Sequence, residues 1–156
     1  MEVTRLGRVR QFNLAAEAFL RDLAVAHPEV ATPEFRETYA SNTSPGEALL
    51  KHFCRSTHGR FDELAKKSIT GSLAVLPHVD LARFTGPRAK TGNAAAVWAH
   101  VRLLQVLACD YQLDPAHLAK KAHEIAASGN REKAAAWILY LQDMQIRRDQ
   151  LLRMRH

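Results

Sequence analysis

The sequence contains little of what marks secreted, fibrous or membrane-spanning proteins. It has 2 cysteines, 7 glycines and 6 prolines among 156 residues, which excludes a disulfide-rich scaffold and a low-complexity chain. Its longest apolar stretch is too short to cross a bilayer, because His100 and Arg102 interrupt it. It shows no secretory signal peptide. We therefore expect a protein without a membrane span that is not secreted and that resides in a reducing intracellular compartment, the cytoplasm or the nucleus.

Basic residues outnumber acidic ones. The chain has 22 lysines and arginines against 16 aspartates and glutamates, which gives a formal net charge of +6. Such an excess favours acidic partners, namely nucleic acid, an acidic protein surface or anionic lipid. The excess is modest and forms no unbroken basic run, so composition alone does not choose among these partners.

One segment is apolar around almost its whole circumference when it is drawn as a helix. Residues 92–111 read GNAAAVWAHVRLLQVLACDY, and such a helix in a soluble protein must lie among other helices. On both sides of it, apolar residues recur every three or four positions, which is the spacing of amphipathic helices. The predicted flanking helices cover residues 4–26, 33–41, 45–59, 61–68, 115–128 and 131–154. The expected fold is all-α: a single domain over residues 1–156, a bundle of about six to seven helices around a buried central helix.

Capping residues mark the boundaries of several of these helices. Thr32 and Asp114 are each followed by a proline, and this pair of residues is typical of a helix start. Ser44 opens the S-x-x-E spacing of a capping box. Gly129 and Asn130 separate the last two helices, the glycine as a helix end and the asparagine as the next cap.

The stretch 69–87 is the least regular part of the sequence. Its apolar residues are interrupted by Pro77, so we expect a connector that packs inward, with a turn of helix over residues 79–84. A β-strand over residues 73–76 is the alternative, although it has no obvious partner strand in the sequence.

No motif for catalysis or cofactor binding stands out. Cys54 and Cys109 lie in apolar helical patterns away from helix starts, so we expect buried thiols rather than nucleophiles. His52, Cys54 and His58 are spaced so that a helix spreads them around its axis instead of gathering them on a metal ion. Residues 85–92 lack the order of a phosphate-binding loop. We therefore expect no enzymatic activity, no cofactor and no metal.

A basic loop precedes the central helix. Residues 85–93 read TGPRAKTGN, a composition typical of an exposed loop. Because free N–H groups and the dipole at a helix N-terminus attract anions, a phosphate or an acidic side chain could bind among Arg88, Lys90 and Thr91. The alternative is a solvated basic loop without a ligand.

The C-terminal end is the second candidate surface. Arginines occur there among scattered apolar residues, namely Arg147, Arg148, Arg153 and Arg155. We expect residues 145–156 to form a basic amphipathic tail beyond the core that packs on a neighbouring chain or an acidic surface. Deletion of residues 146–156 should then leave the fold intact and abolish association. The alternative is a frayed terminus.

Three segments, taken in order, resemble a group of small helical proteins. They are Phe12-Asn13 with Phe19-Leu20-x-Asp22-Leu23 and Pro28-Glu29, then Leu76-Pro77-x-x-Asp80-Leu81-x-x-Phe84, then Ala96-Val97-Trp98-x-x-Val101-x-Leu103-Leu104. Over about residues 12–108 this order resembles helical proteins of unassigned function encoded by large double-stranded DNA viruses of algae and protists. The resemblance implies a virus-encoded, virion-associated protein, and it brings no catalytic residues to transfer.

Taken together, these features predict a non-enzymatic structural or protein-interaction protein, one component of a larger assembly such as a virion. Its expected partners are other protein subunits, either further copies of itself or a different chain. The alternative is a nucleic-acid-binding protein that neutralises phosphates without reading sequence. The chain lacks the aromatic and basic alternation of single-strand binders and the spacing of a helix-turn-helix.

Overall fold

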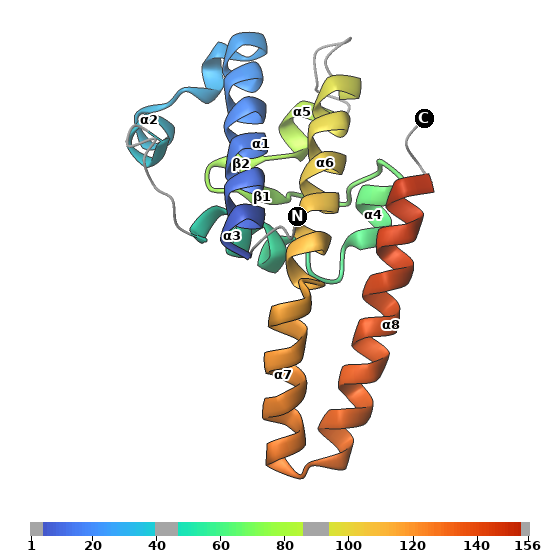
Figure 1. Cartoon of the computed structure of the whole chain (residues 1–156). Helices are drawn as coiled ribbons and strands as arrows, with labels where there is room; N and C mark the ends of the chain where they lie inside the picture. Colours follow the sequence, from blue (N-terminus) through green and yellow to red (C-terminus); the bar gives the residue numbers. More distant parts are fainter. Residues whose placement is uncertain (1–4, 40–46, 86–93, 154–156) are drawn as a thin grey trace.

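The computed structural model in Figure 1 shows a helical body from which a pair of helices extends as an arm. It describes residues 5–39, 47–85 and 94–153. The elements are α1 (Arg5–Ala26), a 3-10 turn η1 (Pro28–Val30), α2 (Pro33–Tyr39), α3 (Ala48–Ser56), α4 (Phe61–Ala65), β1 (Ala74–Leu76), β2 (Val79–Asp80), α5 (Ala82–Thr85), α6 (Ala94–Gln112), α7 (Pro115–Ser128) and α8 (Arg131–Arg153). The prediction of an all-α helical bundle is confirmed.

The core of the body lies between α1 and α6, which run side by side in opposite directions (Figure 1). Phe12 and Phe19 of α1 and Leu104 of α6 are completely buried there. Phe12 also meets Phe53 of α3 edge to face, with ring centroids 5.5 Å apart, an arrangement that aromatic pairs favour. The three- and four-residue spacing of apolar positions along α1 therefore forms the stripe that the sequence predicts.

The predicted central helix is α6, and it contacts α1, α3, α5 and α8. Its burial is one-sided rather than complete. Val97, Val101 and Leu104 face the core, whereas Ala99 is exposed and Leu103 remains 47% exposed. The apolar residues on the outer side are mainly alanines, and so small a side chain can stand in water at little cost.

The irregular connector forms a small β-hairpin, which corrects the expectation that a strand there would lack a partner. β1 pairs with β2 in antiparallel orientation, and Pro77 and His78 form the turn, with His78 at a φ of 63°. The Asp80 carboxylate accepts hydrogen bonds from the backbone N–H groups of Leu73 and Ala82, at 2.9 and 3.1 Å. The pairing of these neighbouring strands thus satisfies the hydrogen-bonding groups of the backbone and lets the apolar side chains point into the core.

A polar clamp holds the segment between α4 and this hairpin. Arg60 donates to both carboxylate oxygens of Glu63, at 2.8 and 3.0 Å, and to the carbonyl oxygens of Thr70 and Ser72, each at 2.7 Å. Glu63 also accepts a hydrogen bond from the backbone N–H of Thr70 at 2.8 Å. The hydrogen bond from Arg60, aided by the one from Thr70, lowers the pKa of Glu63 from 4.5 to about 2.

The clamp predicts a distinct behaviour in acid. Because the pKa of Glu63 is depressed in the folded state, its ionised carboxylate stabilises the fold. This contribution to the free energy of unfolding is complete above pH 4.5 and is lost as the pH falls through about 2. We expect the urea midpoint of the native chain to fall more steeply over this interval than that of Glu63→Gln. Equal slopes in the two proteins, measured by circular dichroism, would contradict the assignment.

Asp114 fixes the junction between α6 and α7. Asp114 is buried, with only 3% of the residue exposed. Its carboxylate accepts a hydrogen bond from the backbone N–H of His117 at 3.3 Å and pairs with Nε of Arg8 at 3.0 Å. The predicted caps at Thr32 and Asn130 are confirmed by their hydrogen bonds to the N–H groups of Phe35 and Lys133. The Ser44 capping box lies outside the described residues.

We predict that Asp114→Ala destabilises the chain by about 2 kcal/mol or more, because it removes a helix cap and leaves Arg8 without its carboxylate. Chemical unfolding followed by tryptophan fluorescence measures this loss. Glu17→Ala is the matched control, since it breaks the exposed Glu17–Arg21 pair and should cost at most about 0.5 kcal/mol. A similar cost for both variants would show that Asp114 has no special role.

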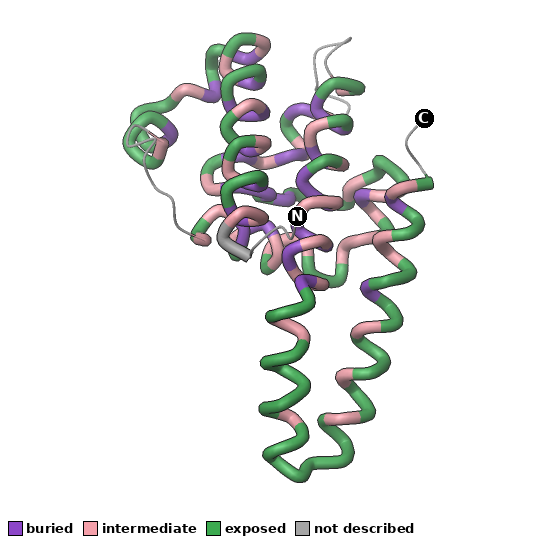
Figure 2. Tube along the Cα trace, in the orientation of Figure 1, coloured by how far each residue is buried: buried purple, intermediate pink, exposed green. Residues whose placement is uncertain are grey.

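The arm consists of α7 and the first half of α8 (Figure 1). α7 contains no buried residue, and α8 contains two, Met144 and Leu151. Figure 2 shows the same division, with buried positions gathered in the body and few along the arm. On α7, Leu118 and Ile125 are half-buried and Ala122 is exposed.

The structure corrects the prediction of a basic tail over residues 145–156. Leu151 is completely buried, and it and Met144 pack in one cluster with Cys109 of α6. Met144 and Leu151 are two helical turns apart and so share a face of α8. Deletion of residues 146–156 would remove this contact, so the described end of α8 anchors the arm, and the segment that leaves the body is its beginning.

Candidate functional site

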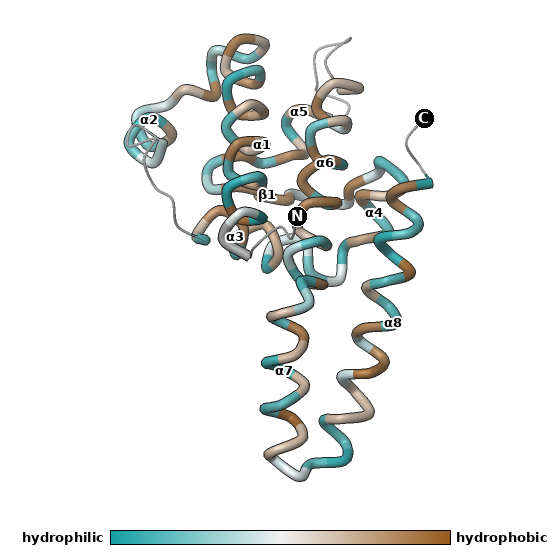
Figure 3. Tube along the Cα trace, viewed as in Figure 1, coloured by the Kyte–Doolittle hydropathy of each residue, from teal (hydrophilic) through white to brown (hydrophobic). Residues whose placement is uncertain are grey.

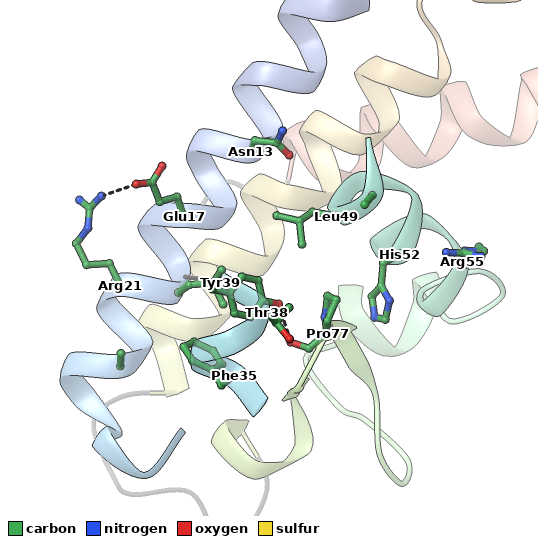
Figure 4. Close-up of a pocket in the computed structure, with 13 residues that line it drawn as sticks. Asn13, Glu17, Arg21, Phe35, Thr38, Tyr39, Leu49, His52, Arg55 and Pro77 are labelled. Carbon is green, nitrogen blue, oxygen red and sulfur yellow. Dashed lines mark hydrogen bonds and ion pairs between the residues drawn. The ribbon is translucent and has the colours of Figure 1, made fainter. Parts of the chain in front are cut away.

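A cavity of about 600 Å³ lies between α1, α2 and α3 (Figure 4). The hydroxyl of Tyr39 donates a hydrogen bond to the carbonyl oxygen of Pro77 at 2.6 Å. Nε2 of His52 lies 2.9 Å from the carbonyl oxygen of Ala74. Burial raises the pKa of Tyr39, so its hydroxyl stays protonated. These two polar groups therefore hold the β-hairpin against α2 and α3.

Both cysteines line a smaller cavity of about 220 Å³ beneath α8. Burial raises the pKa of each thiol to about 11, so Cys54 and Cys109 are protonated at neutral pH and poor nucleophiles. His58 lines this cavity and His52 lines the larger one. Among the described residues, no three His, Cys, Asp or Glu side chains are gathered as a metal site.

The predicted basic loop lies outside the described residues except for Thr85. Arg88, Lys90 and Thr91 fall in residues 86–93, and Arg155 falls in residues 154–156, so all four lie outside the described residues. Their proposed role in anion binding stays a prediction.

The remaining predicted arginines lie on the anchored half of α8. Arg148 pairs with Asp110 of α6 at 2.6 Å, and this hydrogen bond raises the pKa of the guanidinium. Arg147 pairs with Asp143 at 3.0 Å, and its guanidinium carbon lies 5.1 Å from the ring centroid of Phe61. These two side chains attach α8 to the body, whereas Arg153 is exposed at the helix end.

α8 presents large apolar side chains to solvent, both on the arm and on its anchored half. Ile138, Leu139 and Ile146 of α8 are 55%, 66% and 57% exposed, and Figure 3 shows hydrophobic positions along this helix where Figure 2 shows exposure. Isolated exposed leucines are common, but a group on one helix indicates a surface that meets another molecule. We call Ile138, Leu139 and Ile146 the outer apolar face of α8.

The two sides of the arm differ in charge. One side holds a shallow groove of about 320 Å³ lined by Lys121, Glu124 and Lys133 together with Trp137 and Tyr140, whose rings stack with centroids 5.4 Å apart. Trp137 thus lies half-buried on the arm. By helical spacing, the side of α8 away from this groove carries the uncharged residues Ala135, Ile138, Gln142 and Gln145, with Arg131 at one end and Asp149 at the other.

The sequence prediction overlooked this outer apolar face. Ile138, Leu139 and Tyr140 form a run that is apolar around the helix, so spacing alone does not single out one side. The sequence did contain one signal for this face. α8 is apolar on two sides, whereas its neighbour α7 is largely polar and alanine-rich, so α7 covers only one of the two sides.

Comparison with known proteins adds no assignment. No protein-family model matches the chain, and no curated protein and no solved structure matches it at a significant level. No helix in residues 5–39, 47–85 and 94–153 is both long and apolar enough to span a membrane. The resemblance to viral proteins therefore stays a prediction.

The position of Arg148 predicts how firmly the arm is held. Arg148→Gln should weaken the attachment of α8 by roughly 1–2 kcal/mol, because it removes a charge-assisted hydrogen bond that is only partly exposed to water. Amide hydrogen exchange over residues 144–153 should accelerate while exchange in α1 stays unchanged. Arg153→Gln provides the control, and equal acceleration in both variants would contradict this role.

Proposed function

We propose that this chain is a non-enzymatic protein-interaction module that joins a larger assembly through the α7–α8 arm. The observation that carries the proposal is the outer apolar face of α8, where three large side chains are each more than half exposed. Covering each of them would contribute on the order of 1 kcal/mol. In the terms of the sequence resemblance, such an assembly would be a virion.

The arm gains little from its own packing, which supports this proposal. α7 has no buried residue, and helices as short as its 14 residues are marginal without tertiary contacts. A partner that covers the arm would supply the apolar contacts that the body does not. The body, in contrast, buries a continuous cluster of apolar side chains from α1, α3 and α6.

Nucleic-acid binding has less support. Over residues 115–143 the arm carries four basic side chains, Lys120, Lys121, Arg131 and Lys133, against three acidic ones, Glu124, Glu132 and Asp143. A net charge of one is a weak attraction for phosphates. Two of the C-terminal arginines are already paired with carboxylates of the chain, so we place protein partners first.

Site-specific cross-linking tests the proposed function. We expect a photo-reactive residue at Leu139, in the full chain and in the cells from which it derives, to give a discrete adduct of higher mass. The matched control is Leu14 of α1, which is 59% exposed and lies on the body. Adducts that form equally from both positions, or from neither, would refute docking through the arm.

The apolar nature of the contact has its own test. Adding Ile146→Lys to the Leu139 cross-linker should abolish the adduct, since a charge in an apolar contact is costly to desolvate. Arg153→Lys, at an exposed position of the same helix, should leave the yield unchanged.

A further inference from the structure

We propose that the partner of the arm is a second copy of this chain, with the two α8 helices packed antiparallel along their exposed sides. This inference rests on the proposed function and names the partner. It follows from how charges are arranged at the two ends of one helical row.

The row runs along the side of α8 that faces away from the body. Arg131 and Asp149 are 18 residues apart, which is five full helical turns, so both lie on the same side of the helix. Between them, the heptad-like spacing of four and three places Ala135, Ile138, Gln142 and Gln145 on that side. The row is therefore uncharged except for a cation at one end and an anion at the other.

This pattern is complementary to itself in one orientation. If two helices pair antiparallel about a two-fold axis at residue 140, each Arg131 meets Asp149 of the second copy. Ile138 then lies opposite Gln142, and Ala135 lies opposite Gln145. A parallel pairing would instead bring like charges together at both ends, which opposes association. A two-fold contact of this kind closes on itself and yields a dimer.

The row is open to a partner along its whole length. All six of its residues are exposed, including Gln145 and Asp149, which belong to the anchored half of α8. The body lies on the opposite side, where Met144 and Leu151 are buried and Arg148 pairs with Asp110. Among the described residues, no ion pair involves Arg131 or Asp149. Leu139 and Ile146 flank the row and would be covered by the second helix.

The size of the contact predicts its strength. A helix about 10 Å wide that rises 1.5 Å per residue offers a strip of roughly 270 Å² between Arg131 and Asp149. Stable interfaces bury about 800 Å² per partner. The dimer should therefore be weak, and it should become weaker as salt screens its two exposed ion pairs.

Charge reversal of the full chain tests this arrangement by sedimentation equilibrium at low salt. Arg131→Asp and Asp149→Arg should each weaken self-association by about tenfold, because each places like charges together twice. Mixing the two variants should restore association, since every pair in the mixed dimer is again of opposite charge. The double variant should also dimerise. Lys133→Asp, with the same charge change on the groove side, is the control.

The outcomes separate this inference from the proposed function. Failure of the mixture to associate more tightly than either variant alone, with each variant folded by circular dichroism, would overturn the antiparallel dimer. If Leu139 nevertheless cross-links to a chain of different mass, the arm still binds a protein and only the second copy is excluded. A Leu139 adduct of twice the mass of the chain supports both.

Discussion

The carboxylate of Asp114 determines how the two parts of the molecule are joined. Asp114 lies between the end of α6 in the body and the start of α7 in the arm. It caps α7 and at the same time pairs with Arg8 of α1. A buried carboxylate without both partners would be costly, so the chain is held at one angle where α6 and α7 meet. Pro115 reinforces the break, since proline is tolerated only at the start of a helix. Asp114 and the attachment of α8 to α6 together set the direction of the arm.

Body and arm are stabilised in different ways. The body buries aromatic and aliphatic side chains from α1, α3 and α6 around Phe12 and Phe53, whereas the arm relies on its junction at Asp114 and on the attachment of α8 through Met144, Leu151 and Arg148. Local stability differs within one chain when buried contacts are distributed so unevenly. The surface we assign to partners therefore lies on the part of the molecule that contributes least to its own core.

Local signals in the sequence predicted most of the helices and their ends. Thr32, Asp114, Gly129 and Asn130 act as expected because a cap depends on neighbouring residues alone. Predictions that required knowledge of distant contacts were less successful. The turn at Pro77 and His78 supplies β1 with a partner that residues 73–76 do not reveal, and the burial of Leu151 depends on Cys109, which is 42 positions earlier in the sequence. The exposure of Leu139 had one signal in the sequence, the polar and alanine-rich composition of α7, because the apolar run of α8 by itself would also suit a fully enclosed helix.

The cavity beneath α8 has a chemical consequence. Its walls combine Cys54 and Cys109 of the body with Tyr140, Met144 and Leu151 of α8, so the helix acts as a cover over both sulfur atoms. When the cover is in place, the thiols are shielded and protonated. If α8 detaches from the body, both thiols become exposed to solvent. Their rate of alkylation then reports how often α8 detaches.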